Sequence, residues 1–315
     1  MNKILVTGGA GNIGSAIVEK LIADPENQVT IVDDLSTGFL SKLPSEKSDR
    51  WDFVKADVNN LDEVAPIMNS QKFDYVFHFA AVVGVARTQE NPVKVLNDIN
   101  GIRNILDLSR NTAVKRVFFS SSSEVYGEPV MLPQHEHTTP LNSRVPYAVV
   151  KNVGESFCKS YHQEYRLNYT IFRFFNTYGP NQSTDFVMAR FLAAALKGQD
   201  ITIYGDGLQT RTFTYIDDTT DTCLGCLYKN LHVNDVINIG NDQLCTVLDL
   251  AHQILKITGS KSKIVHMPPL KDGDMTRRQP DNTKMREVLG RPLITLEDGI
   301  KRMMSSQHFL SSIGM

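Results

Sequence analysis

Residues 7–14 read Thr-Gly-Gly-Ala-Gly-Asn-Ile-Gly, and they decide the fold of this 315-residue chain. An apolar run typical of a strand, Lys3–Thr7, leads into them, and a helical spacing of apolar residues follows. Gly8, Gly11 and Gly14 permit a tight turn, a close approach of the backbone to a diphosphate, and close helix–strand packing. The free N–H groups and positive end of the helix face that diphosphate. A glycine-rich turn between a strand and a helix therefore predicts a dinucleotide-binding site.

The next strand ends in acidic residues that select the dinucleotide. Gln28–Asp33 is a second apolar run, and Asp33 lies about 20 residues beyond the glycines, where such folds place an acid. A carboxylate at this point accepts hydrogen bonds from the ribose hydroxyls of the adenosine half and repels a 2′-phosphate. Asp34 adds to that repulsion. The sequence therefore predicts NAD, rather than NADP, as the cofactor.

Short β-branched runs alternate with helical stretches through the first half of the chain, and this order predicts an α/β fold. We expect a doubly wound parallel sheet of the Rossmann type, with helices on both faces and right-handed crossovers. The further strands expected in this half are Trp51–Ala56, Tyr75–Phe79, Lys115–Ser120 and Tyr169–Phe174.

The second half of the chain is less regular and predicts a smaller α/β lobe that is interleaved with the Rossmann domain. We expect the Rossmann domain over residues 1–174 and 214–240, and the substrate-binding lobe over 175–213 and 241–315. Residues 130–145 show no periodicity, so we expect a loop beside the site. The elements expected in this half are helices Phe186–Leu196, Val247–Ile257 and Leu296–Met304, and strands Ile201–Tyr204, Thr212–Tyr215 and Val236–Ile239.

Composition argues against several classes of partner. The net charge of −2 provides no basic field for nucleic acid or for an anionic membrane surface. No run approaches the roughly 20 apolar residues of a membrane span, and the amino terminus lacks the features of a signal peptide. Cys223 and Cys226 form a CxxC in an apolar helical segment without a second ligand pair, so we expect buried structural thiols and no metal. We therefore expect a cytoplasmic protein that binds neither nucleic acid nor membrane.

A serine-rich strand end and a Tyr–Lys pair predict the chemistry. Residues 119–127 read Phe-Ser-Ser-Ser-Ser-Glu-Val-Tyr-Gly at the carboxyl end of a strand, where open α/β sheets bind ligands. Tyr147 and Lys151 share one face of the following helix. The lysine ammonium is expected to lower the pKa of the phenol, which then takes a proton from a substrate hydroxyl while hydride leaves the same carbon. A nearby serine hydroxyl would hold the substrate oxygen.

These segments carry a resemblance to a known family that runs nearly from end to end. The chain resembles the extended short-chain dehydrogenase/reductase superfamily, and within it the NAD-dependent nucleotide-sugar epimerases, dehydratases and decarboxylases. The segments that carry it are residues 7–14, Val-Asp-Asp-Leu-Ser-Thr-Gly at 32–38, His-Phe-Ala-Ala at 78–81, Ser-Ser-Ser-Glu-Val-Tyr-Gly at 121–127, Pro-Tyr-Ala-Val-Val-Lys at 146–151, Arg-Phe-Phe-Asn-Thr-Tyr-Gly-Pro at 173–180, residues 204–218, and Arg-Arg-Gln-Pro-Asp at 277–281.

The resemblance implies an enzyme that holds NAD and oxidises a hydroxyl of a nucleotide-diphosphate sugar, usually at C4, to a ketone. Tyr147 would be the base, Lys151 would orient the nicotinamide ribose, and Ser122 would hydrogen-bond the sugar oxygen. The cofactor-binding residues that it implies are Gly8, Gly11, Asn12, Ile13, Gly14, Asp33, Asp34, Ser36, Thr37, Gly38, Asp57, Val58, Phe79, Ala80, Ala81, Ser120, Tyr147, Lys151 and Phe175. The substrate-binding residues that it implies are Ser122, Asn176, Tyr204, Arg211 and Arg277.

The resemblance also implies a homodimer and shows two departures from the family pattern. The dimer would form through helices around residues 101–111 and 147–165. The family usually carries Asn where this chain has Asp98, shortly before the helix glycine that matches Gly101. The Ser or Thr that is common inside the Tyr–Lys motif is replaced by Val150.

Glu124 occupies a position whose residue type differs among the family enzymes that form a 4-keto sugar. Plain 4-epimerases usually carry a small residue there, whereas decarboxylases and dehydratases often carry Glu. The dTDP-glucose dehydratases place Asp where this chain has Ser123. Residues 277–281 resemble UDP-glucuronate decarboxylases, but Ala148 and Val149 replace the acidic residue that follows their tyrosine.

We therefore expect a 4-epimerase first. A UDP-glucuronate-type decarboxylase and a 4,6-dehydratase are the alternatives, and in both of them Glu124 would act chemically. The fold also hosts non-catalytic NAD-binding regulators and reductases of small ketones. Intact Ser122, Tyr147 and Lys151 argue against the first of these, and Arg211 argues against the second.

Overall fold

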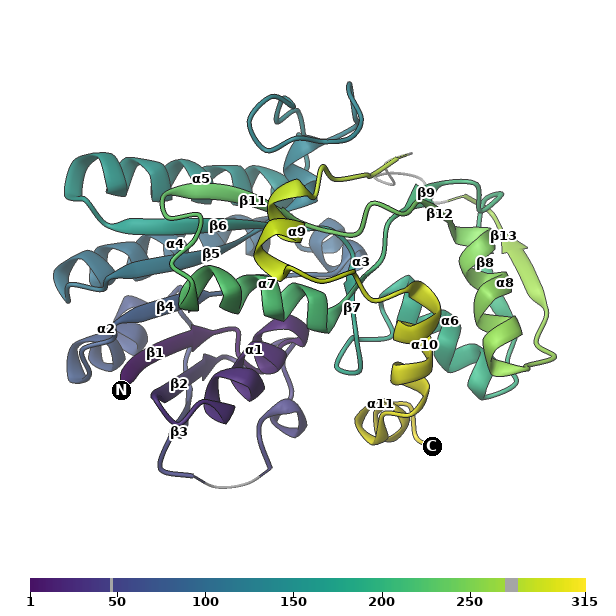
Figure 1. Ribbon diagram of the computed structural model, residues 1–315, viewed down its shortest axis with the longest axis horizontal. Coiled ribbons are helices and arrows are strands. Elements are labelled where there is room, and N and C mark those ends of the chain that lie inside the picture. Colours follow the sequence, from purple (N-terminus) through teal and green to yellow (C-terminus); the bar gives the residue numbers. More distant parts are fainter. Residues whose placement is uncertain (46–47, 270–276) are drawn as a thin grey trace.

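A parallel sheet of seven strands forms the centre of the larger half of the molecule (Figure 1). The structure is a computed structural model that describes residues 1–45, 48–269 and 277–315. The strand order is β11-β6-β5-β4-β1-β2-β3, and all neighbours are parallel, which confirms the predicted doubly wound sheet. The strands are β1 (Asn2–Thr7), β2 (Asn27–Asp33), β3 (Trp51–Lys55), β4 (Tyr75–His78), β5 (Arg116–Ser122), β6 (Asn168–Phe174) and β11 (Asp235–Ile239).

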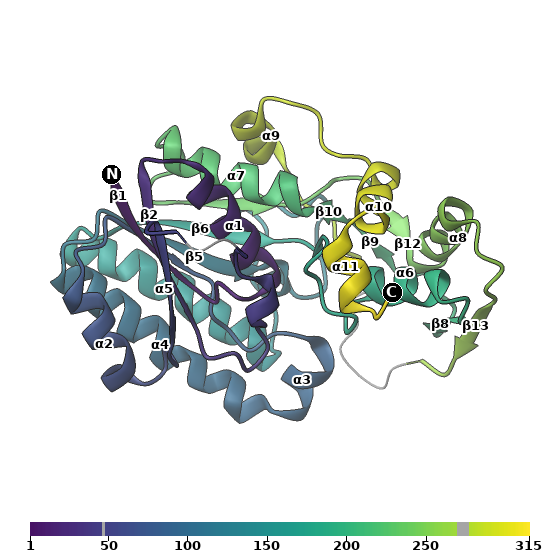
Figure 2. The same ribbon diagram turned by 90° about the horizontal axis from the view of Figure 1, so that it is seen from below.

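Helices cover both faces of this sheet (Figure 2). One face carries α1 (Asn12–Ala23), α7 (Ile216–Tyr228) and α9 (Thr283–Leu289). The other face carries α2 (Leu61–Ser70), α4 (Pro92–Asn111) and α5 (Pro146–Tyr165). Each layer buries its own apolar core against the sheet, as a sheet with two apolar faces requires.

The smaller half has its own hydrophobic core and three two-stranded sheets. β8 (Ile201–Tyr204) pairs with β13 (Ile264–Met267), β9 (Thr210–Arg211) with β12 (Cys245–Thr246), and β7 (Thr177–Tyr178) with β10 (Thr214–Tyr215). Its helices are α6 (Val187–Leu196), α8 (Val247–Thr258), α10 (Leu296–Met304) and α11 (Gln307–Ser312).

The chain passes repeatedly between the two halves. After β6 it enters the smaller half, and it returns for α7 and β11 before it leaves again. The segment 241–315, which we expected to belong to the smaller lobe, returns once more to supply α9. Met285 and Val288 of α9 are fully buried in the core between the sheet, α1 and α7, so that helix belongs structurally to the Rossmann side.

The strand expected over Thr212–Tyr215 differs from the structure. The chain forms two short strands there, because residues 210–211 pair with β12 and residues 214–215 pair with β7. Residues 130–145 contain no helix or strand apart from one bridge, Gln134 to Pro280, as the missing periodicity predicts. Two short 3-10 helices, η1 (Leu40–Lys42) and η2 (Ser123–Tyr126), complete the elements near the sheet, together with α3 (Val85–Glu90).

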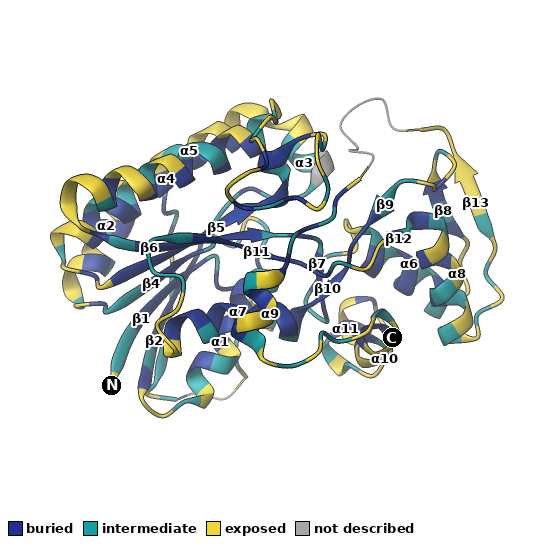
Figure 3. Cartoon of the chain, turned by 45° about the horizontal axis from the view of Figure 1, so that its top comes forward, coloured by how far each residue is buried: buried dark blue, intermediate teal, exposed yellow. Residues whose placement is uncertain are grey.

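Burial follows the layers of the fold (Figure 3). The central strands are buried, and the outer faces of the helices are exposed. Cys223 and Cys226 lie buried and unbonded to each other on α7, which confirms their predicted burial. Within the described residues, no helix combines the length and the apolar character that a membrane crossing demands.

Candidate functional site

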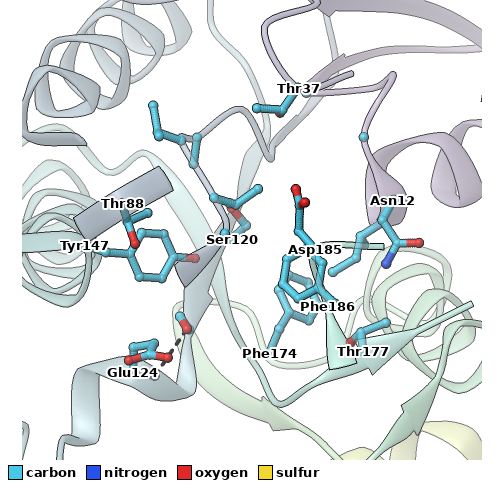
Figure 4. A pocket seen from close by; sticks show the side chains of 18 of the residues that line it. Asn12, Thr37, Thr88, Ser120, Glu124, Tyr147, Phe174, Thr177, Asp185 and Phe186 are labelled. Atoms are coloured by element: carbon cyan, nitrogen blue, oxygen red, sulfur yellow. Dashed lines mark hydrogen bonds between the residues drawn. The ribbon is translucent and has the colours of Figure 1, made fainter. Parts of the chain in front are cut away.

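A cavity of about 630 Å³ lies at the carboxyl ends of the parallel strands, between the two halves of the molecule. The strand order reverses between β1 and β4, and such a switch point is where open α/β sheets bind ligands. Figure 4 shows Tyr147 reaching into the cavity from one side, with Asn12, Phe174 and Phe186 on the opposite side.

Most residues expected at the site line this one cavity. They are Gly8, Gly11, Asn12, Ile13, Gly14, Asp33, Asp34, Ser36, Thr37, Asp57, Val58, Phe79, Ala80, Ala81, Ser120, Ser122, Glu124, Tyr147, Lys151, Asn176, Tyr204 and Arg211. Residues far apart in the sequence are thus brought together as the motifs require. Their individual binding roles stay predictions.

Three expected residues do not line the cavity. Phe175 is fully buried and packs on Tyr126, whereas its neighbour Phe174 lines the cavity. Arg277 is exposed outside the cavity. Gly38 packs behind Asp33, where a Cβ atom would lie 2.7 Å from the carboxylate. These three residues lie off the cavity wall, and their binding roles stay predictions.

The glycine turn leaves room for a phosphate-bearing group against bare backbone. Gly8 has a φ of +70°, and a Cβ atom there would lie 2.6 Å from the backbone of Phe79 and Ala80. A Cβ atom on Gly14 would overlap the carbonyl oxygen of Gly8. The turn passes directly into α1, whose first N–H groups are free for an anion. This cradle fits the diphosphate of a dinucleotide.

Asp33 is held in position by two backbone donors. Ala10 N–H and Leu35 N–H each donate to its carboxylate over 2.9 Å. Burial raises the pKa of Asp33 above its ordinary value, and the two hydrogen bonds oppose that effect. A fixed carboxylate at the edge of the cavity suits two ribose hydroxyls, so this end of the cavity fits the adenosine half of NAD.

The catalytic candidates lie at the start of α5 and the end of β5. Lys151 Nζ lies 5.7 Å from the centre of the Tyr147 ring and donates to Ser120 Oγ over 3.2 Å. Ser122 hydrogen-bonds Tyr147 and accepts from the Glu124 N–H over 3.2 Å. The tyrosine hydroxyl and a serine hydroxyl can thus reach one substrate oxygen together.

The charges around this pair differ from what the sequence predicts. Burial raises the pKa of Tyr147 well above its ordinary value, and the Glu124 carboxylate raises it further. Burial lowers the pKa of Lys151 to about 8, and Asp98 opposes that change. The expected lowering of the tyrosine pKa is therefore not found. A positive charge brought next to the hydroxyl would lower that pKa again.

Asp98 occupies its unusual place without disturbing α4. Its carboxylate accepts from Val82 N–H over 2.7 Å, and the side chain is buried at the cavity wall. Gly101 lies over Asn59, whose side-chain oxygen accepts from the glycine N–H over 3.0 Å. The register of the helix is therefore intact, and the departure from the family pattern adds one negative charge near Lys151.

Glu124 forms an ion pair that the sequence did not predict. Arg278 Nη2 lies 2.5 Å from Glu124 Oε1, and Arg278 is buried at the cavity wall. Both charges act on Tyr147: Glu124 raises its pKa and Arg278 lowers it. Of two adjacent arginines, the one that lines the cavity could be chosen only from the structure.

The smaller half supplies the rest of the wall. Asn176 has a φ of +35° and donates to the carbonyl oxygen of Thr212 over 3.0 Å. Arg211 is buried and donates to the carbonyl oxygen of Thr210 over 2.8 Å. Further wall residues that the sequence did not indicate include Thr88, Thr177, Gln182, Asp185, Phe186 and Arg190. Thr177 lies in the segment 173–180 that carries the family resemblance, whereas the other five lie outside the quoted motifs.

Comparisons with known proteins agree with this geometry. The sequence model of the NAD dependent epimerase/dehydratase family matches residues 4–240. A UDP-N-acetyl-alpha-D-glucosaminuronate decarboxylase of Bacillus cytotoxicus is 34% identical over 313 residues and covers 95% of either chain. A putative UDP-glucose 4-epimerase of Methanocaldococcus jannaschii is 36% identical over 308 residues, covering 96% of this chain and 97% of its own.

A solved structure leads to the same family. The crystal structure of UDP-glucose 4-epimerase from Thermotoga maritima, with UDP-glucose, superposes with a TM-score of 0.91 at 33% identity and covers 99% of both chains. The chain therefore belongs to the NAD dependent epimerase/dehydratase family and is an NAD-dependent enzyme that modifies nucleotide sugars.

Proposed function

We propose that this enzyme decarboxylates a UDP-linked hexuronic acid through a 4-keto sugar. The observation that carries the proposal is the ion pair between Glu124 and Arg278 beside Tyr147. Epimerisation at C4 needs no further charged pair at the sugar, whereas a substrate with its own carboxylate needs a cationic receptor. The sequence alone favours a 4-epimerase, and the Glu124–Arg278 pair favours decarboxylation instead.

The residues of the site would divide the oxidation step among them. Tyr147 takes the proton of the C4 hydroxyl, Ser122 holds the C4 oxygen, and Lys151 holds the nicotinamide ribose. NAD, when bound beside Tyr147 and Lys151, would supply the hydride acceptor for the C4 hydrogen. Its positive charge has the sign that lowers the pKa of Tyr147.

The 4-keto product is a β-keto acid, and its carbon–carboxylate bond breaks readily. The bonding electrons pass to the C4 oxygen as carbon dioxide leaves, and the hydroxyls of Tyr147 and Ser122 stabilise the resulting enolate. Arg278 would bind the carboxylate before its loss, because a guanidinium fork matches a carboxylate. Glu124 would then relay a proton from solvent to C5, which replaces the departed carboxylate. Return of hydride and of the Tyr147 proton to C4 restores the alcohol.

One observation favours 4-epimerisation as a second candidate. Tyr147 is followed by Ala148 and Val149, so this stretch of α5 lacks the acidic residue that is usual in UDP-glucuronate decarboxylases. An epimerase needs only the transient ketone and the return of hydride to the other face of the sugar. A 4,6-dehydratase using Glu124 requires an acid at C6 in addition.

The decisive experiment offers the purified protein UDP-glucuronic acid, its 2-acetamido counterpart and UDP-glucose, with mass spectrometry and NMR of the products. We expect loss of carbon dioxide from a uronic acid. An unchanged mass with an inverted C4 would replace the proposal by epimerisation, and loss of water would replace it by dehydration.

Variants test the assignment of roles. Glu124→Gln and Arg278→Gln should each lower decarboxylation by about 100-fold or more, since they remove a proton donor and a carboxylate receptor. Tyr147→Phe should abolish turnover of any substrate, because it stops the oxidation. Activity that survives in Glu124→Gln and Arg278→Gln would contradict the proposal.

A further inference from the structure

Arg190 is a cation in the cavity wall whose hydrogen-bonding capacity is unused. It lies on α6 and lines the cavity together with Tyr204 and Arg211. Its Nε atom is fully buried, and none of the residues that the structure describes accepts a hydrogen bond from it. Across residues 1–45, 48–269 and 277–315, no side chain forms an ion pair with it.

The immediate surroundings of Arg190 are aromatic rather than acidic. Its guanidinium carbon lies 5.6 Å from the centre of the Phe191 ring and 5.8 Å from that of Tyr204. Such contacts hold a cation in place but leave its N–H groups unsatisfied. Burial lowers the pKa of Arg190, and the charges of Tyr204 and Asp185 oppose this effect. A half-buried guanidinium with a buried, unpartnered Nε is costly without an anion, so the arrangement is matched to a negative ligand.

Other partly or fully buried arginines of the protein have their partners within the chain. Arg173 forms a bidentate pair with Glu155, and Arg278 pairs with Glu124. Arg116 donates to backbone carbonyls and to Asn230. Arg190 differs from these three because it lies at the cavity and no residue in the described part of the chain accepts a hydrogen bond from it.

We propose that Arg190 binds the diphosphate of the nucleotide sugar together with Arg211. This rests on the proposed nucleotide-sugar substrate, and it adds a residue that no sequence motif marks. Two phosphates carry more charge than one guanidinium neutralises, and guanidinium groups bind phosphate oxygens in a bidentate manner. The carboxylate of the sugar has a separate receptor in Arg278, and Arg190 lies on the lobe that carries the nucleotide-side candidates Tyr204 and Arg211.

Binding rather than turnover tests this proposal. The NAD-loaded protein is titrated calorimetrically with UDP, UMP and uridine, which differ only in their phosphates. Arg190→Gln should weaken the binding of UDP by about 10- to 100-fold, which is the contribution expected of hydrogen bonds to a charged group. The affinity for uridine should not change. Arg190→Lys should restore part of the affinity, since it keeps the charge but loses the fork.

A matched control variant removes a positive charge at the other end of the same helix. Lys197→Gln, at the exposed end of α6, should change the affinity for UDP little. Thermal unfolding without nucleotide checks the fold of Arg190→Gln, which should not be destabilised because an unpaired cation is removed. An equal loss for uridine and UDP would overturn the proposal in favour of base recognition, and an unchanged affinity for UDP would overturn it outright.

The outcome is independent of the reaction at the sugar. If UDP binding depends on Arg190 while no uronic acid is decarboxylated, the proposed reaction fails and the anion site stands. If carbon dioxide is released and Arg190→Gln leaves both UDP affinity and KM unchanged, the anion site fails alone. Under turnover, we expect Arg190→Gln to raise KM for the nucleotide sugar and to change kcat little.

Discussion

Asp98 departs from the family pattern at a position close to the catalytic candidates. It is buried at the cavity wall, and its charge opposes the burial that lowers the pKa of Lys151. Asp98→Asn keeps an oxygen acceptor for the Val82 N–H and removes the charge, together with the long contact of 3.5 Å from Asn59 Nδ2. The pKa of Lys151 should then fall further below about 8, so that the lysine loses its proton at a lower pH.

The measurement is kcat/KM against pH for the NAD-loaded enzyme. We expect the alkaline limb of the profile to move to lower pH by about one unit in Asp98→Asn. Asp62→Asn, which removes an exposed carboxylate outside the cavity, is the control and should leave the profile in place. An alkaline limb that coincides with that of the unaltered enzyme would show that Asp98 does not set the charge of Lys151.

At the scale of residues, sequence reasoning found the chemistry but not each contact. The glycine turn, Asp33, Ser122, Tyr147 and Lys151 all line one cavity, because motif spacing fixes their place on strands and helices. It did not distinguish between neighbours in an extended segment, where one side chain enters the cavity and the next turns away. It also could not find Arg190, because an arginine inside a helix carries no signal until its surroundings are known.

At the scale of elements, α5 places the catalytic pair because it lies very close to β5. Gly154 makes this approach possible: a Cβ atom there would overlap the ring of Phe119, which is itself buried on β5. Lys151 Nζ lies 5.2 Å from the centre of the same ring. Gly154→Ala should therefore push α5 outwards, destabilise the protein by about 1–3 kcal/mol and displace Lys151.

Chemical denaturation and initial rates test this prediction. Helix propensity alone would make Gly154→Ala stabilising by about 1 kcal/mol, so the expected sign is opposite to that of propensity. Gln163→Ala, on the exposed face of α5, controls for propensity and should change stability little. If the Gly154→Ala variant is more stable and fully active, α5 can move outwards without a loss of stability and the prediction is wrong.

The same scale shows which elements a sequence can predict. The strands of the large sheet were all found within a residue or two, because long apolar runs and fixed alternation identify them. β7, β9, β10 and β12 have only two residues each, too few to show any period. They arise from pairing between distant segments, and so does the return of α9 to the large sheet.

At the scale of the whole molecule, the cavity belongs to neither half alone. Its wall combines the strand ends of the sheet with α6, β8 and β9, and the interleaved chain holds the two halves together. Sequence analysis predicts interleaved lobes because the chain has no low-complexity linker between them. Packing sets the volume of the cavity and brings Arg278 to Glu124 in its wall, and no local sequence pattern encodes that packing.

The outer faces of α4 and α5 lead to a prediction about assembly. The two helices pack side by side at the periphery of the sheet, and they expose Val93, Leu96, Val149 and Tyr165. A shallow depression on α5 is lined by Asn152, Val153, Ser156, Phe157 and Ser160. We propose that two copies dimerise through these helices, as the family resemblance implies, because a four-helix contact covers apolar surface on both copies at once.

Size-exclusion chromatography with light scattering measures the outcome. The unaltered protein should have the mass of a dimer, and Ser156→Arg should shift it to a monomer, because two copies of the new cation meet across a two-fold axis. Leu61→Arg, on an exposed site of α2, is the control and should remain dimeric. Because α5 also carries Tyr147 and Lys151, loss of the dimer should lower kcat as well as the mass. A monomeric unaltered protein with full activity would separate catalysis from assembly and remove the proposed interface.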